Sequence, residues 1–255
     1  MKRPLIITVL LSLTVVAGCA SQAPNTDSTS LGVADPYESF NRKMFKLNSV
    51  SDKYVLRPVA KGYKTVVPGI MRRGIGNFFD NLTTPRSAIN NVLQGKPGRG
   101  LNELGRFVVN STVGIGGLFD VAAAGGMERY EEDFSQTLAV WGVSEGNYLV
   151  IPFFGPRTML STASIPVDGY TDLQFHINDT GTRDKLNVLD IIDGRARLLS
   201  TDELLNKSAD PYIALREAYL QNREFNIYDG DPPVPDDFYD FDEFDEEDAA
   251  YDETE

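Results

Sequence analysis

Apolar residues recur at helical spacing from residue 37 onward, and the first such stripe consists of Tyr37, Phe40, Met44, Leu47 and Tyr54. Asp35 is a typical N-cap residue, and Pro36 suits the first helical position because its missing amide hydrogen would have no partner there. Glu38, three residues after Asp35, completes a capping-box pattern. The sequence predicts a helix from this start to Arg57-Pro58, where proline ends it.

Five later stretches have the same spacing. One starts at Pro68, the next is opened by Pro85 and stopped by Gly95, and the last starts at Asp210-Pro211-Tyr212. Their apolar positions are Met71, Ile75, Phe78 and Leu82; Ala88, Ile89, Val92 and Leu93; Leu101, Leu104 and Val108; Leu189, Ile192, Ala196 and Leu199; and Leu215 and Tyr219. The tripeptide at 210–212 repeats that at 35–37, which we interpret as a shared way of capping a helix. Few segments alternate as strands do, so the sequence predicts one mainly α-helical domain.

Two long stretches carry almost no charge. Asp120 is the only charged residue in 107–127, and Glu145 is the only one in 135–156. Glycines interrupt both stretches and prolines also interrupt the second, so neither can form a straight membrane-spanning helix. Two interpretations remain open: a buried core with tight turns, which the pattern alone favours, or a short helical disc partly immersed in a lipid leaflet.

The N-terminus has the pattern of a secretory signal. Lys2 and Arg3 precede an apolar run at residues 5–17, which is too short to span a bilayer. The run ends at Val16-Ala17-Gly18-Cys19, which resembles a bacterial lipobox. Residues 1–18 are therefore predicted to be a lipoprotein signal peptide, with diacylglyceryl and acyl groups on Cys19 as the anchor. Ala20 after the cysteine points to the outer membrane of a Gram-negative bacterium, and residues 19–34, rich in small polar residues, should form a flexible tether.

The charge is concentrated at the other end of the chain. The whole sequence has 24 basic and 37 acidic residues, a net charge of -13. Residues 229–255 contain 14 acidic residues and no basic one, which leaves the rest near neutrality. We expect this segment to be a disordered acidic tail, and residues 35–228 to be the folded domain.

Several classes of chemistry are excluded by composition. The chain has one cysteine, Cys19, and one histidine, His176, so it can form neither an internal disulfide nor a Cys/His zinc site. No phosphate-binding loop or nucleic-acid motif is present, and we expect neither a cofactor nor a nucleic-acid partner.

An enzyme remains an alternative because Gly142-Val143-Ser144-Glu145-Gly146 has the G-x-S-x-G pattern of hydrolases. That pattern needs a strand before the serine, a helix after it and a later histidine. Here residues 147–152 look extended, and His176 is the only available base, with Asp168 or Asp172 as the third member. We interpret the match as chance and predict a protein that is not an enzyme. An envelope phospholipase and a purely structural envelope lipoprotein are the alternatives.

A series of ordered blocks resembles one family. The blocks are DPYESFNR (35–42), YVLRPVA (54–60), NFFDNL (77–82), LQGKP (93–97), GRFVVNST (105–112), GGLFD (116–120), EDF (132–134), WGV (141–143) and DPY (210–212). Together they resemble the MlaA (VacJ) outer-membrane lipoproteins. The resemblance covers about residues 35–228 and leaves the acidic tail unexplained.

The resemblance implies a ring-like helical body in the outer membrane with an amphipathic passage. Phospholipids would leave the outer leaflet through it, which maintains lipid asymmetry. In that family the lipoprotein associates with a trimeric porin and passes phospholipid to a soluble periplasmic carrier.

Candidate residues for the passage follow from chemistry and from the motif. Arg42, Arg72 and Arg73 are candidates for contact with lipid phosphate, because guanidinium binds phosphate in a bidentate manner. Phe40 and Asn41 lie in the first block of the resemblance, where Phe40 is expected to pack the ring. Gly142 and Gly146 flank a short turn and could hinge a loop that gates the passage.

Overall fold

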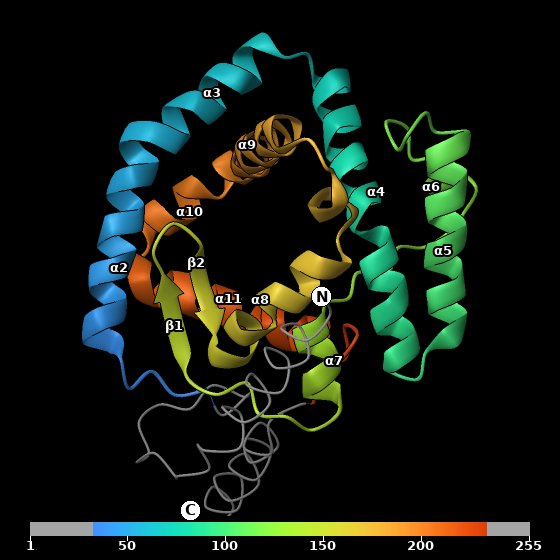
Figure 1. Cartoon of the computed structure of the whole chain (residues 1–255). Helices are drawn as coiled ribbons and strands as arrows, with labels where there is room; N and C mark the ends of the chain where they lie inside the picture. The colour runs from blue at the N-terminus through green and yellow to red at the C-terminus, as the bar shows by residue number, and fades with distance from the viewer. Residues whose placement is uncertain (1–32, 234–255) are drawn as a thin grey trace, which may run out of the picture.

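A helical arch, interrupted by a turn at residues 67–68, forms the outside of the body in the computed structural model, which describes residues 33–233 (Figure 1). The arch consists of α2 (Glu38–Ser51), the π-helical turn η1 (Asp52–Leu56), α3 (Arg57–Val66) and α4 (Gly69–Leu93). After a short turn, α5 (Pro97–Thr112) runs back alongside α4 as a projecting arm (Figure 1). The predicted signal peptide, Cys19 and residues 234–255 lie outside the described residues.

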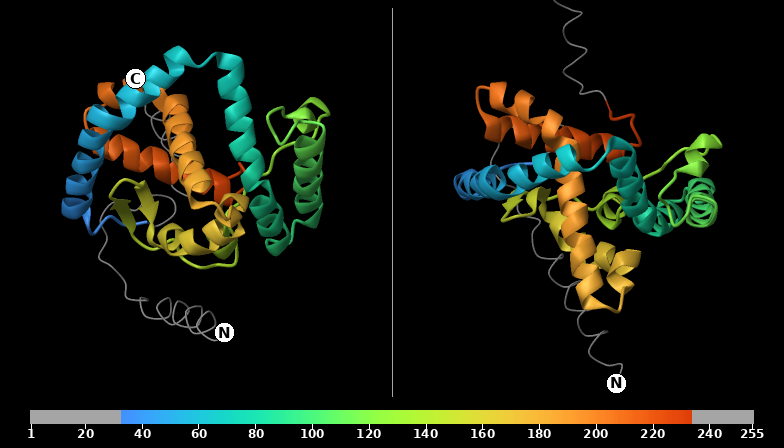
Figure 2. Two further views of the ribbon diagram at one scale, coloured as in Figure 1. Left: turned by 45° about the horizontal axis from the view of Figure 1, so that its top comes forward. Right: turned by 90° about the horizontal axis from the view of Figure 1, so that it is seen from above.

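The remaining elements lie inside the arch or across its two faces. α9 crosses the region that the arch encircles, the end of α8 and the start of α9 project from one face, and α10 and α11 lie on the other (Figures 1 and 2). In chain order these elements are α6 (Val121–Ala124), α7 (Phe134–Val140), β1 (Tyr148–Ile151), β2 (Gly155–Thr158), α8 (Met159–Thr171), η2 (Leu173–His176), α9 (Thr180–Arg197), η3 (Leu198–Ser200), α10 (Asp202–Lys207) and α11 (Pro211–Ile227). The two strands pair antiparallel, with Tyr148 opposite Thr158. The prediction of a mainly α-helical body is confirmed.

Arg57-Pro58 does not end the first helix, contrary to the prediction. The backbone stays helical and widens into the π-helical turn η1, in which the Arg57 amide donates to the carbonyl of Asp52. This change of register places Pro58 in the first turn of α3. A missing amide hydrogen costs little in a first turn, so the π-helical turn lets the arch continue past a proline.

Pro85 does not separate two helices either, because α4 runs through it as one helix. The half of α4 after Pro85 is held by polar contacts to the segment before α7 and to α7 itself. Asn91 donates to the carbonyl of Tyr130 at 3.1 Å, and the Thr137 hydroxyl donates to Asn90 at 2.8 Å. These contacts outweigh the lost backbone hydrogen bond. The predicted stop at Gly95 is confirmed, since Gly95 has the left-handed φ of +78°.

The two Asp-Pro-Tyr tripeptides do not share a capping role, so that prediction was wrong. Asp210 caps α11 by accepting from the amides of Tyr212 and Ile213, whereas no side chain caps α2. Instead, the Asp35 carboxylate accepts a hydrogen bond from the Tyr212 hydroxyl and another, at 2.7 Å, from the Asn41 amide. The repeated motifs therefore meet and join the first helix of the arch to the last helix of the chain.

The distribution of polar and apolar residues is inverted relative to a water-soluble protein. Among the described residues, 12 buried ones are hydrophobic and 20 are polar or charged, whereas 34 large hydrophobic side chains are exposed. Half of the apolar positions predicted from the sequence are in the exposed set, including Phe40, Tyr54, Met71, Leu101 and Val108. In the described part of the chain, no helix combines the length and apolar character needed to cross a membrane. The outward stripes therefore offer an apolar surface without a spanning helix.

The small hydrophobic core lies where the first described residues and strand β1 meet α11. Val33, Tyr148, Val150, Tyr212 and Leu220 form it. The segment expected as a tether thus contributes Val33 to the packed body.

The segment expected as an acidic tail contributes in a similar way at its first residue. Asp229 lies 2.6 Å from the Lys96 ammonium and 2.5 Å from the Arg99 guanidinium. It is therefore tied by ion pairs to the start of the α5 arm.

We expect Tyr212→Phe to lower the free energy of unfolding by about 2 kcal/mol, because it removes a buried hydrogen bond to a carboxylate. Thermal unfolding of the purified protein in detergent, followed by circular dichroism, measures this. Tyr228→Phe is the matched control, since the Tyr228 hydroxyl has no hydrogen bond among the described residues. Equal melting temperatures for the two variants would show that the Asp35–Tyr212 contact does not hold the ends together.

Candidate functional site

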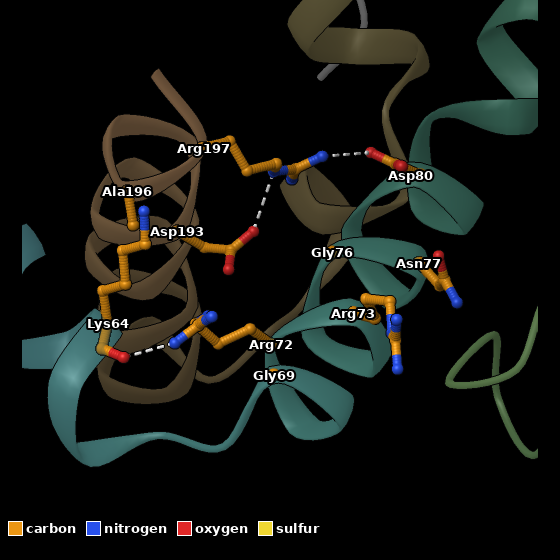
Figure 3. A pocket seen from close by; sticks show the side chains of 10 residues that line it. All are labelled: Lys64, Gly69, Arg72, Arg73, Gly76, Asn77, Asp80, Asp193, Ala196 and Arg197. Carbon is orange, nitrogen blue, oxygen red and sulfur yellow. Dashed lines mark hydrogen bonds and ion pairs between the residues drawn. The ribbon is translucent and has the colours of Figure 1, made fainter. Parts of the chain in front are cut away.

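A cavity of about 420 Å³ lies between the end of α3, the first turns of α4 and the last turns of α9 (Figure 3). It is lined by Lys64, Gly69, Arg72, Arg73, Gly76, Asn77, Asp80, Asp193, Ala196 and Arg197. Its volume is within the range of small-molecule sites. Four cationic and two acidic side chains line it, so its lining carries a formal excess of two positive charges.

The cations differ in how far they are already engaged. Arg72 donates through Nη1 to the carbonyls of Lys64 and Val67, the latter at 2.9 Å, and so closes the turn between α3 and α4 (Figure 3). Arg73 and the Lys64 ammonium are exposed and have no ion pair among the described residues. The charges of Lys64 and Arg73 are therefore uncompensated, and Arg72 has only neutral carbonyl partners among the described residues.

The carboxylates are already paired. Asp193, 2% exposed, accepts from the Tyr63 hydroxyl at 2.8 Å and lies 3.0 Å from Nε of Arg197. Asp80 lies 2.7 Å from Arg129 Nη1 and 3.6 Å from Arg197 Nη1. Arg197 thus bridges the two acids across the cavity (Figure 3). Burial, reinforced by the hydrogen bond to Asp193, raises the pKa of Tyr63 to about 12, so its phenol stays a donor at neutral pH.

The start of α4 adds a further positive contribution. Pro68 precedes the helix, no side chain caps its first amides, and its first turn contains no acidic residue. The unpaired amides at a helix N-terminus carry about half a positive charge, which acidic residues usually offset. Arg72 and Arg73 lie in this region instead, so the positive potential is strengthened.

A second polar pocket adjoins the cavity at Asn77 and Asp80. It lies toward α5, where Arg106 makes a bidentate contact with Asp120 at 2.9 and 3.1 Å. Its volume of about 20 Å³ suits a single water molecule rather than a ligand. Within residues 33–233, no cluster of three or more potential metal ligands is found.

Of the three predicted arginines, the structure brings Arg72 and Arg73 together and places Arg42 elsewhere. Arg42 lies 2.6 Å from Glu38 and 2.8 Å from Asp210, and its guanidinium stacks over the Tyr212 ring. Arg42 therefore belongs to the junction between α2 and the start of α11. Sequence reasoning missed Lys64, Asp193 and Arg197; the last two are four residues apart on α9, a spacing that places them on one helix face.

Phe40 and Asn41 are neighbours with opposite environments. Phe40 is half exposed, on the apolar outside of the arch. Asn41 is fully buried, and its side chain donates to the Tyr148 carbonyl at 3.1 Å and accepts from the Val150 amide at 2.9 Å. Asn41 thus holds strand β1 of the β-hairpin against α2 through hydrogen bonds from its side chain to the strand backbone. The role of both residues in a lipid passage stays a prediction.

Gly142 and Gly146 flank a loop whose centre is fixed. Both have left-handed φ angles, +89° and +71°, which favour glycine. Between them, Glu145 is buried and accepts from Arg223 at 3.0 and 3.1 Å and from the Thr158 hydroxyl at 2.6 Å. The two glycines therefore surround an anchored residue, and their gating role stays a prediction.

The surroundings of Ser144 do not fit a hydrolase. α7 precedes the serine and strand β1 follows it, the reverse of the order that a nucleophile elbow requires. His176 contacts the Tyr170 carbonyl at 2.8 Å, and Asp172 contacts Arg86 at 3.1 Å. Among the described residues no hydrogen bond joins Ser144 to His176, or His176 to Asp168 or Asp172.

We expect Glu145→Ala to lower the free energy of unfolding by about 3 kcal/mol or more, because it leaves the Arg223 guanidinium buried without its main partner. Glu203→Ala is the control, since it removes an exposed ion pair with Lys207 and should cost less than about 1 kcal/mol. Chemical denaturation of both variants measures the difference. A cost for Glu145→Ala as small as the control's would mean that the loop is not anchored through this pair.

Comparison with known proteins identifies relatives along nearly the whole described chain. The family model for the MlaA lipoprotein matches residues 33–226. A Haemophilus influenzae protein and an Escherichia coli protein, both named intermembrane phospholipid transport system lipoprotein MlaA, are 36% and 38% identical, over 90% and 84% of this chain and 93% and 85% of their own. A solved structure described as the structural basis for maintenance of bacterial outer membrane lipid asymmetry aligns with a TM-score of 0.69 at 38% identity, covering 76% of this chain and 99% of that one. The chain belongs to the MlaA lipoprotein family.

Proposed function

We propose that this protein is an outer-membrane lipoprotein of an intermembrane phospholipid transport system. It removes phospholipids from the outer leaflet of the outer membrane and so maintains lipid asymmetry. The single observation that carries the proposal beyond family membership is the inverted body: an apolar outside surrounds a polar interior with a cationic cavity. A body of this kind can lie in a leaflet and offer polar contacts at membrane depth.

The cavity addresses the main barrier to lipid movement between leaflets. A charged headgroup that enters hydrocarbon loses its hydration, and polar protein groups lower this cost by replacing water. We assign the phosphate contact to Arg72 and Arg73, which line the cavity (Figure 3). The acyl chains remain in contact with the apolar outside of the body. Arg42 has a different role, since it joins α2 to Asp210 at the start of α11.

The anchor and the partners complete the proposal. Cys19 carries the covalent diacylglyceryl and acyl groups, and the transported ligand is phospholipid, without a further cofactor. A trimeric outer-membrane porin holds the protein, and a soluble periplasmic carrier receives the lipid from it. Phe40 packs the outside of the arch, and Gly142 and Gly146 hinge the gate. These assignments rest on the family resemblance and on the positions of the residues.

We expect cells that lack this protein to accumulate phospholipid on their surface, because retrieval from the outer leaflet stops. A surface-accessible lipase reporter measures this, and the wild-type gene should restore the low signal. Cys19→Ala should fail to restore it, because the protein loses its anchor. An unchanged surface signal in the deletion strain would contradict the transport function.

The phospholipase alternative is tested by Ser144→Ala. The hydroxyl of Ser144 is exposed and makes only a local contact, accepting from the Gly146 amide at 3.3 Å. We expect the variant to restore asymmetry as well as wild type does. Loss of a phospholipid-hydrolysing activity in the purified variant would instead favour the enzyme.

A further inference from the structure

The charge balance of the cavity indicates what kind of headgroup it accepts. Its lining has four cations and two carboxylates, and Asp80 is shared with a further cation, Arg129. Both carboxylates are in ion pairs with arginines: Asp193 with Arg197, and Asp80 with Arg129 and Arg197. Asp193 also accepts from the Tyr63 hydroxyl, although its buried Oδ2 has no hydrogen bond among the described residues. The cations that remain free are Lys64 and Arg73. Among the residues that line the cavity, the charge without an ion-pair partner is therefore positive.

The uncapped start of α4 acts in the same direction. Gly69 and Arg72 of its first turn line the cavity, so the free amides of a 25-residue helix lie at its wall. Backbone amides and the helix dipole stabilise anions at such an end. This contribution is independent of the side chains, because it persists when Lys64 or Arg73 is changed.

From these observations we infer that the cavity is selective for anionic phospholipid heads over zwitterionic ones. The inference rests on the proposed function and specifies its substrate class. Both head types carry a phosphate that Arg73 and Lys64 can contact. A zwitterionic head also brings an ammonium group. The Asp193 and Asp80 carboxylates are already in ion pairs with arginines, so this ammonium lies close to several like charges without a free carboxylate partner in the lining. Like charges a few ångströms apart repel measurably even in partly hydrated surroundings. A head such as phosphoglycerol brings hydroxyls in that place and avoids the repulsion.

Lipid competition tests the inference. The lipidated full-length protein in detergent is incubated with an equimolar mixture of phosphatidylglycerol and phosphatidylethanolamine with identical acyl chains, and bound lipid is quantified by mass spectrometry. We expect about fivefold enrichment of phosphatidylglycerol, since each partly exposed charge contact contributes less than a factor of ten. The enrichment should fall as salt rises from about 0.1 to about 0.5 M, because screening weakens such contacts.

Variants locate the effect. The double variant Lys64→Gln, Arg73→Gln should lower the enrichment to about twofold, because Arg72 and the amides at the start of α4 remain at the cavity. Lys61→Gln is the control for the change at Lys64. Lys61 is exposed on α3, as Lys64 is, but does not line the cavity, so this variant should keep the wild-type enrichment. A double variant that keeps full enrichment overturns the inference, as does wild-type protein that binds both lipids equally.

Two further outcomes separate this inference from the function on which it rests. Wild-type protein that retains neither lipid contradicts the proposed transport itself. Displacement of bound phosphatidylglycerol by millimolar sn-glycerol 3-phosphate shows that the site takes a free phosphate ester rather than a membrane lipid, and it overturns the lipid assignment.

Discussion

The structure depends on satisfying polar groups that are shielded from water. Among the described residues, 34 large hydrophobic side chains are exposed and only 12 hydrophobic residues are buried, five of them in a small core around Tyr148 and Tyr212. Hydrogen bonds and ion pairs must therefore hold the elements together, and in low-dielectric surroundings each of them is strong when complete and costly when broken. Asn41, which joins α2 to the β-hairpin, and Arg223, which joins α11 to Glu145 and Ser135, are such contacts.

The cavity is held in place by the same kind of contact. On the last turns of α9, Asp193 and Arg197 face the cavity, and Arg195 between them points to the arch. Arg195 lies 2.6 Å from Asp52 at the start of the π-helical turn and 2.8 Å from Asp202 in α10. The last turns of α9 thus bind the arch through Arg195 and line the cavity through Asp193 and Arg197. This coupling ties the cavity-lining end of α9 to the π-helical turn of the arch and to α10.

Much of the helical content could be predicted from the sequence, because spacing and capping are local signals. The start of α11 at Asp210-Pro211 and the stop at Gly95 are examples. Asp35-Pro36-Tyr37 was misread because its partner, Tyr212, is distant in sequence, and Pro85 because contacts from residues 130–137 stabilise the helix around it. The direction of the apolar stripes was left open, since a helix that faces lipid has the same period as one that faces a core.

Only part of the candidate site could be predicted from the sequence. Adjacent arginines suggested a phosphate contact; the structure places Arg72 and Arg73 at one cavity, and the phosphate contact itself stays a prediction. Lys64, Asp193 and Arg197 come from α3 and α9, and no local pattern shows that these helices meet α4. Whether a basic residue is free or paired is also a tertiary property. Arg42 and Arg73 look alike in the sequence, yet Arg42 has two carboxylate partners.

The contact between Asp35 and Tyr212 has a consequence for folding kinetics. It joins residues 177 positions apart, so closing this loop costs more entropy than forming any of the local helices. A chain exported from its N-terminus presents the arch first and α11 nearly last, and the two cannot meet until almost the whole body has emerged. During that interval the arch lacks its final partner while its outer side chains already face water. The time between the emergence of residue 35 and of residue 212 is therefore when this protein is most prone to aggregate.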